Sequence, residues 1–187
     1  MPAMEERTCS NGDPLPRIVT DRHGARLRLR PIRPADWHEV QEGYETWTPQ
    51  QKRMRMLDTV AHLTEGMARR FATVGDEEHE VCLVLTPEED DADLLGGARL
   101  VGRAGAEDGE FAVSVRADAQ GRGLGRIALE AVLDAGPSHG ITRAWGLVHR
   151  RNAGMLGLAR ALGMAVRPFP DDITLLVSET PLPRPTA

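Results

Sequence analysis

Three glycines alternate with larger residues along one short stretch of the chain: Gly121, Gly123 and Gly125. They follow an apolar run at residues 111–115 and open a predicted helix over residues 122–135. The first turn of a helix leaves backbone N–H groups unpaired, and the helix dipole favours an anion at that end. Glycines let the anion come close to the backbone. We therefore predict a phosphate or pyrophosphate site, to which Arg122 and Arg126 can add positive charge.

The same glycines fit part of a dinucleotide-binding motif, which is the main alternative. Residues 123–128 match G-x-G-x-x-A, a pattern that is weak on its own. An NAD site would need an acidic residue about 20 residues further on. That place holds residues 148–151, whose two arginines would suit the 2′-phosphate of NADP. Only about one further strand–helix unit follows, too little for a six-stranded dinucleotide domain. A tight turn without a ligand is a third interpretation.

The glycine turn lies within a mixed pattern of strands and helices. Apolar alternation and short apolar runs predict strands at residues 25–31, 81–85, 94–101, 111–115, 141–148 and 173–177. Helices are predicted at residues 35–44, 49–57, 64–73, 122–135 and 152–162. Thr48-Pro49 is a cap followed by proline, Asp108-Gly109 predicts a turn, and Gly136-Pro137 predicts a helix end. This order indicates an α+β fold with a mixed sheet, not a doubly wound one.

Residues 120–125, Gln-Gly-Arg-Gly-Leu-Gly, resemble the Q/R-x-x-G-x-G/A signature of the GNAT acetyltransferases. In that family the signature holds the pyrophosphate of acetyl-CoA. The order of elements is also the GNAT order, and Asn152, eleven residues before Gly163, resembles the family's N-x(10)-G-F/M stretch. The resemblance covers about residues 26–177. It implies the GNAT fold, an N-acetyltransferase that uses acetyl-CoA as acyl donor and no metal, and a direct attack of the amine in a ternary complex.

The resemblance also implies a set of cofactor-binding residues. They are Val113, Ser114, Val115, Gln120, Gly121, Arg122, Gly123, Leu124, Gly125, Arg126 and Asn152. Val113 and Ser114 would pair with the pantetheine arm as an added strand does. Asn152 could equally be the N-cap of the helix that follows it, and the two roles are compatible. The basic cluster at residues 143–151 could hold the 3′-phosphate of CoA.

Glu110 and Val115 are the residues to which the resemblance gives catalytic roles. An amine must be neutral to attack, although a lysine-like amine has a pKa of about 10.4. Glu110 would be the general base, a role that burial beside apolar neighbours would favour. From the residues alone, an ordinary exposed glutamate is the other interpretation, and His79 and His149 are fallback bases. The backbone N–H of Val115 would donate to the thioester oxygen as negative charge develops there.

One family feature is absent from the sequence. Many GNAT enzymes have a tyrosine seven residues after the asparagine, where this chain has Ala159, and its single tyrosine is Tyr44. Water or another group would then protonate the departing thiolate. A non-catalytic acyl-CoA sensor is one hypothesis consistent with the missing tyrosine.

A narrower resemblance concerns the acceptor. Residues 19–36, 110–115 and 152–163 are similar to the catalytic domains of bacterial protein lysine acetyltransferases that modify acyl-CoA synthetases. This favours a protein lysine, or a protein N-terminus, as acceptor and such a synthetase as partner. Those enzymes often carry a regulatory domain, for which this sequence has no room. A small amine, such as a metabolite or an antibiotic, is the alternative acceptor.

Composition and charge narrow the remaining classes. The chain has 187 residues, 41% of them hydrophobic and 27% charged, as expected of one globular domain. We expect the domain at residues 18–180, with flexible tails at 1–17 and 181–187. Two cysteines and scattered histidines predict neither a disulfide framework nor a metal site. The net charge of −5 argues against a nucleic-acid partner. Without an apolar run long enough to span a membrane or a signal sequence, a cytoplasmic protein is expected, and a homodimer is one option for its assembly.

Overall fold

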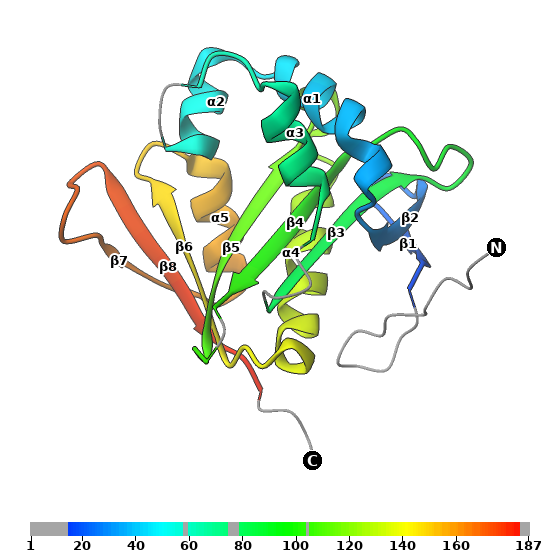
Figure 1. Ribbon diagram of the computed structural model, residues 1–187. Coiled ribbons are helices and arrows are strands. Elements are labelled where there is room, and N and C mark those ends of the chain that lie inside the picture. Colours follow the sequence, from blue (N-terminus) through cyan, green and yellow to red (C-terminus); the bar gives the residue numbers. More distant parts are fainter. Residues whose placement is uncertain (1–14, 58–59, 75–78, 104, 184–187) are drawn as a thin grey trace.

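The computed structural model describes residues 15–57, 60–74, 79–103 and 105–183. One mixed sheet has helices on both of its faces (Figure 1). The strands are β1 (Arg17–Thr20), β2 (Arg26–Pro31), β3 (Glu80–Pro87), β4 (Gly96–Gly102), β5 (Asp108–Val115), β6 (Arg143–His149), β7 (Ala165–Pro168) and β8 (Leu175–Pro181). The helices are α1 (Trp37–Glu45), α2 (Pro49–Met56), α3 (Glu65–Ala72), α4 (Leu124–Ala135) and α5 (Ala153–Ala161). Short 3-10 helices lie at η1 (Pro34–Asp36), η2 (Ala117–Ala119) and η3 (Gly136–His139).

The strand order in the sheet is β1-β2-β3-β4-β5-β6-β8-β7, which confirms the predicted α+β fold with a mixed sheet. Every neighbouring pair is antiparallel except β5 and β6, which run parallel. The β5–β6 ladder is short, since only residues 108–110 and 143–145 pair. Beyond it the two strands separate, and Figure 1 shows them spreading apart toward α2. This opening interrupts the sheet at its centre.

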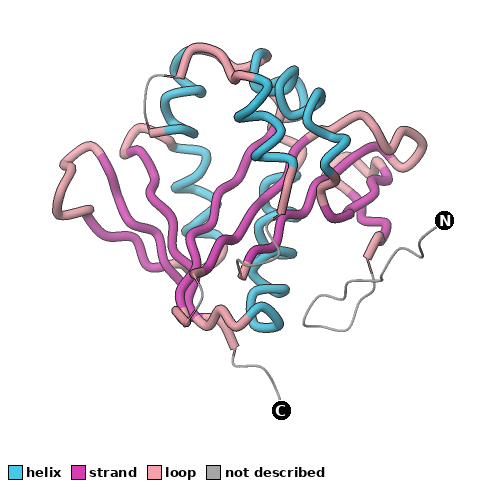
Figure 2. Tube along the Cα trace, in the orientation of Figure 1, coloured by secondary structure: helices cyan, strands magenta, loops and turns pink. Residues whose placement is uncertain are grey.

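The two faces of the sheet carry different helices. Leu83 and Leu100 pack in one apolar core with Leu129 and Val132 of α4. Because side chains alternate along a strand, the neighbouring residues of β3 and β4 point to the opposite face. That face is covered by α1, α2 and α3, whose own apolar cluster includes Tyr44. Figure 2 shows the strands as one layer, with helices before and behind it.

The alternation predicted for β2 is confirmed, with one exception. Leu27 and Leu29 are buried, and Arg26 is exposed. Arg30, however, is only 1% exposed. Its guanidinium lies 2.7 Å from a carboxylate oxygen of Asp36 and 2.7 Å from one of Asp91. A buried charge requires such partners, and this pair of carboxylates provides them.

The helix starts predicted at Thr48-Pro49 and at Thr64 are also confirmed. The hydroxyl of Thr48 accepts a hydrogen bond from the N–H of Gln51 at the start of α2, and Pro49 occupies the first helical position. The hydroxyl of Thr64 accepts from the N–H of Met67 at the start of α3. In both cases a side chain satisfies an N–H that the helix itself leaves unpaired.

Some local predictions are wrong. Asp108-Gly109, expected to form a turn, begins β5, and Gly109 pairs with Gly102 of β4. A Cβ at Gly109 would lie 3.0 Å from the side chain of Ile141, so this glycine serves close packing. The helix α4 ends at Ala135 as expected, but the chain continues into the 3-10 helix η3. The short strands β1 and β7 carry too few residues for a clear pattern.

The domain extends slightly beyond its predicted limits. Leu15 is buried, β1 begins at Arg17, and β8 reaches Pro181. Most of both expected tails, residues 1–14 and 184–187, lies outside the described residues. Within the described ranges, none of the helices is long and apolar enough to cross a membrane.

Candidate active site

The separation of β5 from β6 exposes one edge of β5. The N–H of Arg116 donates to the carbonyl of Leu95, so the peptide groups at this position face β4. Since peptide groups alternate in direction along a strand, those of Val113 and Val115 face the opening toward β6. The Val115 carbonyl accepts a hydrogen bond from Nε1 of Trp47 at 3.0 Å. By the same alternation the peptide groups of Ser114 face β4, so Val113, and not Ser114, can pair with a ligand in the opening.

The glycine turn lies beside this opening and leads into α4. Gly121 and Gly123 have φ angles of 80° and 87°, which other residues rarely adopt. Gly123 is the N-cap of α4, and its carbonyl accepts from the N–H groups of Arg126 and Ile127. The N–H groups of Leu124 and Gly125 precede this first intrahelical bond and have no helical partner. This is the N–H arrangement that an anion requires.

A groove of about 790 Å³ runs between β5, the glycine turn and α5. It is lined by all but one of the residues predicted for the site: Glu110, Val113, Ser114, Val115, Gln120, Gly121, Gly123, Leu124, Gly125, Arg126 and Asn152. A Cβ at Gly125 would lie 3.4 Å from the side chain of Val113, so this glycine faces β5 at van der Waals distance. The fold thus brings residues of β5, of the glycine turn and of the start of α5 together at one groove.

Arg122 is the predicted site residue that does not line the groove. Its Nε lies 2.7 Å from Oδ2 of Asp21, whose side chain is fully buried. The carboxylate of Asp21 also accepts from the N–H groups of His23 and Ala25. This Arg122 hydrogen bond is the main reason why the pKa of Asp21 lies below its usual value. The ion pair of Arg122 with Asp21 therefore holds the β1–β2 turn, residues 21–25, against the glycine turn.

Three arginines outside the glycine motif also line the groove: Arg22, Arg55 and Arg151. Arg22 lies in the β1–β2 turn, and its N–H donates to the carbonyl of Arg122. A Cβ at Gly123 would lie 3.1 Å from the side chain of Arg22, so this arginine covers the glycine turn. Arg151 lines the groove beside Asn152. Arg143, at the other end of the predicted basic cluster, lies instead near the carboxylates of Asp108 and Glu179.

Asn152 is the N-cap of α5. Its Oδ1 accepts a hydrogen bond from the N–H of Met155 at 3.0 Å, and the residue also lines the groove. Ala159, at the position of the expected family tyrosine, is fully buried in the core. The hydroxyl of Tyr44 donates to the carbonyl of Val60, and burial raises the pKa of Tyr44.

Glu110 lies in β5, opposite Trp145 of β6 at the end of the short ladder. Its side chain is exposed and lines the groove, so the apolar burial that would favour the base role is absent. By alternation it shares a face with Ala112 and Ser114, the face that α1, α2 and α3 cover. The fallback bases lie elsewhere: Nδ1 of His79 contacts the carbonyl of His139, and neither His79 nor His149 lines the groove.

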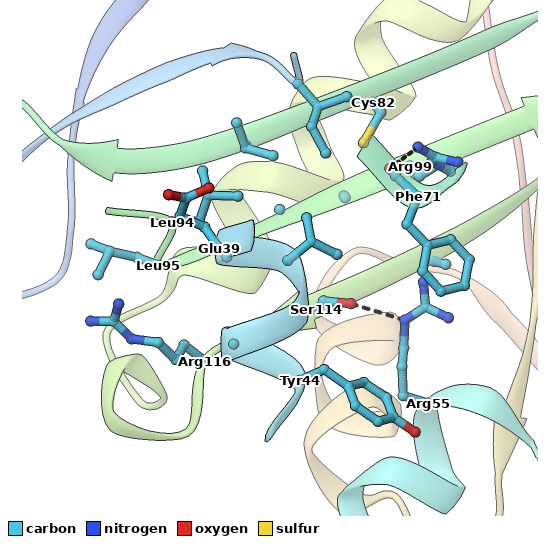
Figure 3. Close-up of a pocket in the computed structure, with 18 of the residues that line it drawn as sticks. Glu39, Tyr44, Arg55, Phe71, Cys82, Leu94, Leu95, Arg99, Ser114 and Arg116 are labelled. Carbon is cyan, nitrogen blue, oxygen red and sulfur yellow. Dashed lines mark hydrogen bonds between the residues drawn. The ribbon is translucent and has the colours of Figure 1, made fainter. Parts of the chain in front are cut away.

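A second cavity, of about 130 Å³, lies on this face between the sheet and α1 to α3 (Figure 3). Its walls are mainly apolar and include Tyr44, Phe71 and Leu95. Four residues line both the cavity and the groove: Trp47, Arg55, Ala112 and Ser114. The two spaces therefore approach each other at β5. Such an arrangement can bring two substrates to the same strand from opposite sides. No group of three or more side chains able to bind a metal occurs among the described residues.

Comparison with known proteins gives a consistent family. The family described as Acetyltransferase (GNAT) domain matches residues 26–165. An acetyltransferase of Pseudomonas aeruginosa, PA5475, is 22% identical over 156 residues, which cover 82% of this chain and 83% of that protein.

Solved structures share the fold. The GNAT domain of S. lividans PAT superposes with a TM-score of 0.78 at 24% identity, covering 89% of this chain and 96% of that one. Spermidine N-acetyltransferase from Vibrio cholerae, solved with CoA and spermine, gives a TM-score of 0.65 at 14% identity. Here 83% of this chain and 95% of that chain are covered.

Proposed function

Because the chain belongs to the GNAT acetyltransferase family, we propose that this N-acetyltransferase uses the groove between β5 and β6 to hold acetyl-CoA and attaches the acetyl group directly to an amine. The observation that carries the proposal is the meeting of the groove with the apolar cavity at β5. One space suits a long phosphorylated donor, and the other suits a second substrate.

The residues of the groove fit such a donor. The unpaired N–H groups at the start of α4 and the dipole of that helix suit a pyrophosphate. Gly121 and Gly123 leave the backbone accessible, and Arg22 and Arg151 add positive charge that the sequence motif did not include. The free edge of β5 at Val113 can form strand-like hydrogen bonds with an amide-containing arm. Asn152 lines the same groove from α5.

Acetyl-CoA supplies a thioester carbonyl that a neutral amine can attack. In the proposed mechanism Glu110 accepts a proton from the ammonium form of the acceptor, directly or through a water, since its carboxylate is exposed to the groove. The N–H of Val115 faces the opening and donates to the carbonyl oxygen as negative charge develops. With Ala159 at the family tyrosine position, solvent in the open groove supplies the proton for the thiolate.

For the acceptor, we extend the proposal to a lysine side chain of a protein. The similarity of residues 19–36, 110–115 and 152–163 to bacterial protein lysine acetyltransferases supports it. A small amine is the second candidate. The cavity favours it, because α1, α2 and α3 cover the space and Tyr44, Trp47 and Phe71 line it.

The test is release of free CoA thiol from acetyl-CoA in the presence of candidate acceptors. The panel contains an acyl-CoA synthetase, a lysine-containing peptide, free amino acids and polyamines. The proposal expects amine-dependent thiol release, with the acetylated amine detected by mass spectrometry. Acetyl-CoA binding without turnover on any acceptor would support a sensor instead and would contradict the proposal.

A further inference from the structure

Arg55 of α2 lies where the apolar cavity and the groove meet. Its side chain is half-buried and lines both spaces. Its Nε donates to the hydroxyl of Ser114 on β5 at 2.9 Å, and Figure 3 shows the guanidinium reaching across to that strand. The other guanidinium nitrogens lie near the place where the two substrates of the proposed reaction would meet.

The other arginines of the cavity have carboxylate partners. Arg99 lies 2.8 Å from a carboxylate oxygen of Glu80. Arg116 binds Asp93 and Asp118. Within residues 15–57, 60–74, 79–103 and 105–183, no carboxylate forms an ion pair with Arg55, whose hydrogen-bond partner is a neutral hydroxyl. Among the described residues, Arg55 thus differs from Arg99 and Arg116 in having no carboxylate within ion-pair distance.

The surroundings make that charge unfavourable as long as it lacks a counter-ion. Burial lowers the pKa of Arg55, and the like charge of Arg99 lowers it further. Glu110 opposes this effect only in part. An arginine remains protonated nonetheless, so an anion bound beside it would relieve the electrostatic strain. The planar guanidinium is also well suited to a carboxylate, which it can bind through two parallel hydrogen bonds.

The cavity adds a second requirement. Its lining is mainly apolar and aromatic, and among the described residues Glu39 supplies its one carboxylate. A polycationic guest would have to lie near Arg55, Arg99 and Arg116 at once. A guest with an apolar body and one carboxylate fits both the walls and the charge.

We propose that Arg55 binds a carboxylate of one of the two substrates, which makes the enzyme selective for a substrate with an apolar body and an acidic group. The inference rests on the proposed function of the groove. The carboxylate has two sources: the α-carboxylate of an amino-acid acceptor, or the distal carboxylate of a dicarboxylic acyl group on CoA. The first source means a small acceptor, whereas the second is compatible with a protein lysine.

The experiment compares wild type with Arg55→Gln in two arms. The acceptor arm measures CoA thiol release from acetyl-CoA with apolar amino acids and with their methyl esters. The donor arm compares succinyl-CoA with butyryl-CoA, using an amine that has no carboxylate. In one of the two arms, wild type should prefer the substrate that carries the carboxylate. Arg55→Gln should lower kcat/KM for that substrate about tenfold to a hundredfold, while kcat/KM for the uncharged analogue changes little. Arg55→Lys keeps the positive charge but cannot form the two parallel hydrogen bonds, so its loss of kcat/KM should be smaller.

Two controls separate folding from recognition. Arg53→Gln removes an exposed arginine from the same helix and should leave both preferences unchanged. Thermal unfolding should show that Arg55→Gln remains folded. If Arg55→Gln is unfolded, the Arg55→Lys variant decides by the same ratio of charged to uncharged substrate.

A binding measurement keeps the result independent of turnover. Calorimetry titrates succinyl-CoA, butyryl-CoA and an N-acetyl amino acid with CoA present into wild type and Arg55→Gln. Turnover with no preference for a carboxylate in either arm, or an equal loss for charged and uncharged substrates in Arg55→Gln, overturns this inference and leaves the proposed function standing. Absence of turnover on every acceptor contradicts the proposed function, and the binding difference alone then decides the role of Arg55.

Discussion

The indole Nε1 of Trp47 donates a hydrogen bond to the carbonyl oxygen of Val115 across 3.0 Å. Trp47 follows α1, and Val115 is the last residue of β5. The bond therefore joins the helical layer to the strand end where the proposed oxyanion donor lies. Trp47 also lines both the cavity and the groove.

Trp47→Phe should slow acetyl transfer more than it weakens acetyl-CoA binding. The Val115 carbonyl would keep only its longer contact with Nε2 of Gln120, at 3.4 Å. We expect a loss of about 1 kcal/mol in the free energy of unfolding and a lower kcat, because the end of β5 would be less firmly held. Trp37→Phe is the matched control, since Trp37 packs against Arg69 of α3 and lines neither the cavity nor the groove. Equal kcat values in the two variants would make the Trp47 bond purely structural.

Glu110→Gln should lower kcat by about a hundredfold or more at neutral pH, the usual size of a general-base contribution. The side chain is exposed and the substitution keeps its shape, so the melting temperature and the Kd for acetyl-CoA should stay unchanged. Glu107→Gln, a change at another exposed glutamate just before β5, provides the control. An undiminished rate in Glu110→Gln would assign the base to another residue or to water.

Asp21→Asn should destabilise the fold in a pH-dependent way. Hydrogen bonding with Arg122 holds the pKa of Asp21 below its usual value, so the ionised carboxylate contributes stability above the unfolded pKa of about 4. That contribution is lost as the pH falls through the lower, folded pKa. Melting temperatures from pH 3 to pH 8 should therefore show a gap between wild type and Asp21→Asn that narrows below about pH 4. A gap that stays constant across this range would contradict the ion pair. The exposed Asp171 offers the control Asp171→Asn, which should show no gap.

Arg22→Gln and Arg151→Gln should each weaken acetyl-CoA binding by roughly tenfold, as expected when a charged hydrogen-bond donor to phosphate is removed. Both side chains are exposed, so the losses should shrink when the salt concentration rises. Titrations at low and high salt measure this directly. Arg160→Gln, at the far end of α5, should have no effect. Loss of affinity in the control but not in the two variants would place the phosphates elsewhere.

The local part of the site was predictable because its signals are local. The glycine turn, the Thr48-Pro49 cap and the apolar run before the glycine turn depend only on nearby residues. The same rules failed at Asp108-Gly109, where pairing with β4 and packing against Ile141 override the turn preference of the dipeptide.

The contacts between distant segments could not be predicted from patterns. Arg22 reaches Gly123, and the ion pair between Asp21 and Arg122 joins residues 101 positions apart. Arg55 reaches Ser114 from a short helix whose sequence gives no sign of a site. Each of these contacts depends on how α2 and the β1–β2 turn pack on the sheet. Whether Glu110 is buried or exposed depends likewise on the separation of β5 from β6.

Calorimetric titration of acetyl-CoA into wild type and Gly123→Trp is the most direct test of the central claim. A tryptophan at Gly123 would fill the space beside Arg22 and adopt an unfavourable φ of 87°. Gly24→Trp is the control, because Gly24 has a similar φ of 83° but nothing within 4 Å of its Cβ position. The account predicts saturable binding to wild type and to Gly24→Trp, with binding lost in a folded Gly123→Trp. Failure of folded wild type to bind acetyl-CoA, or unchanged binding by Gly123→Trp, would contradict it.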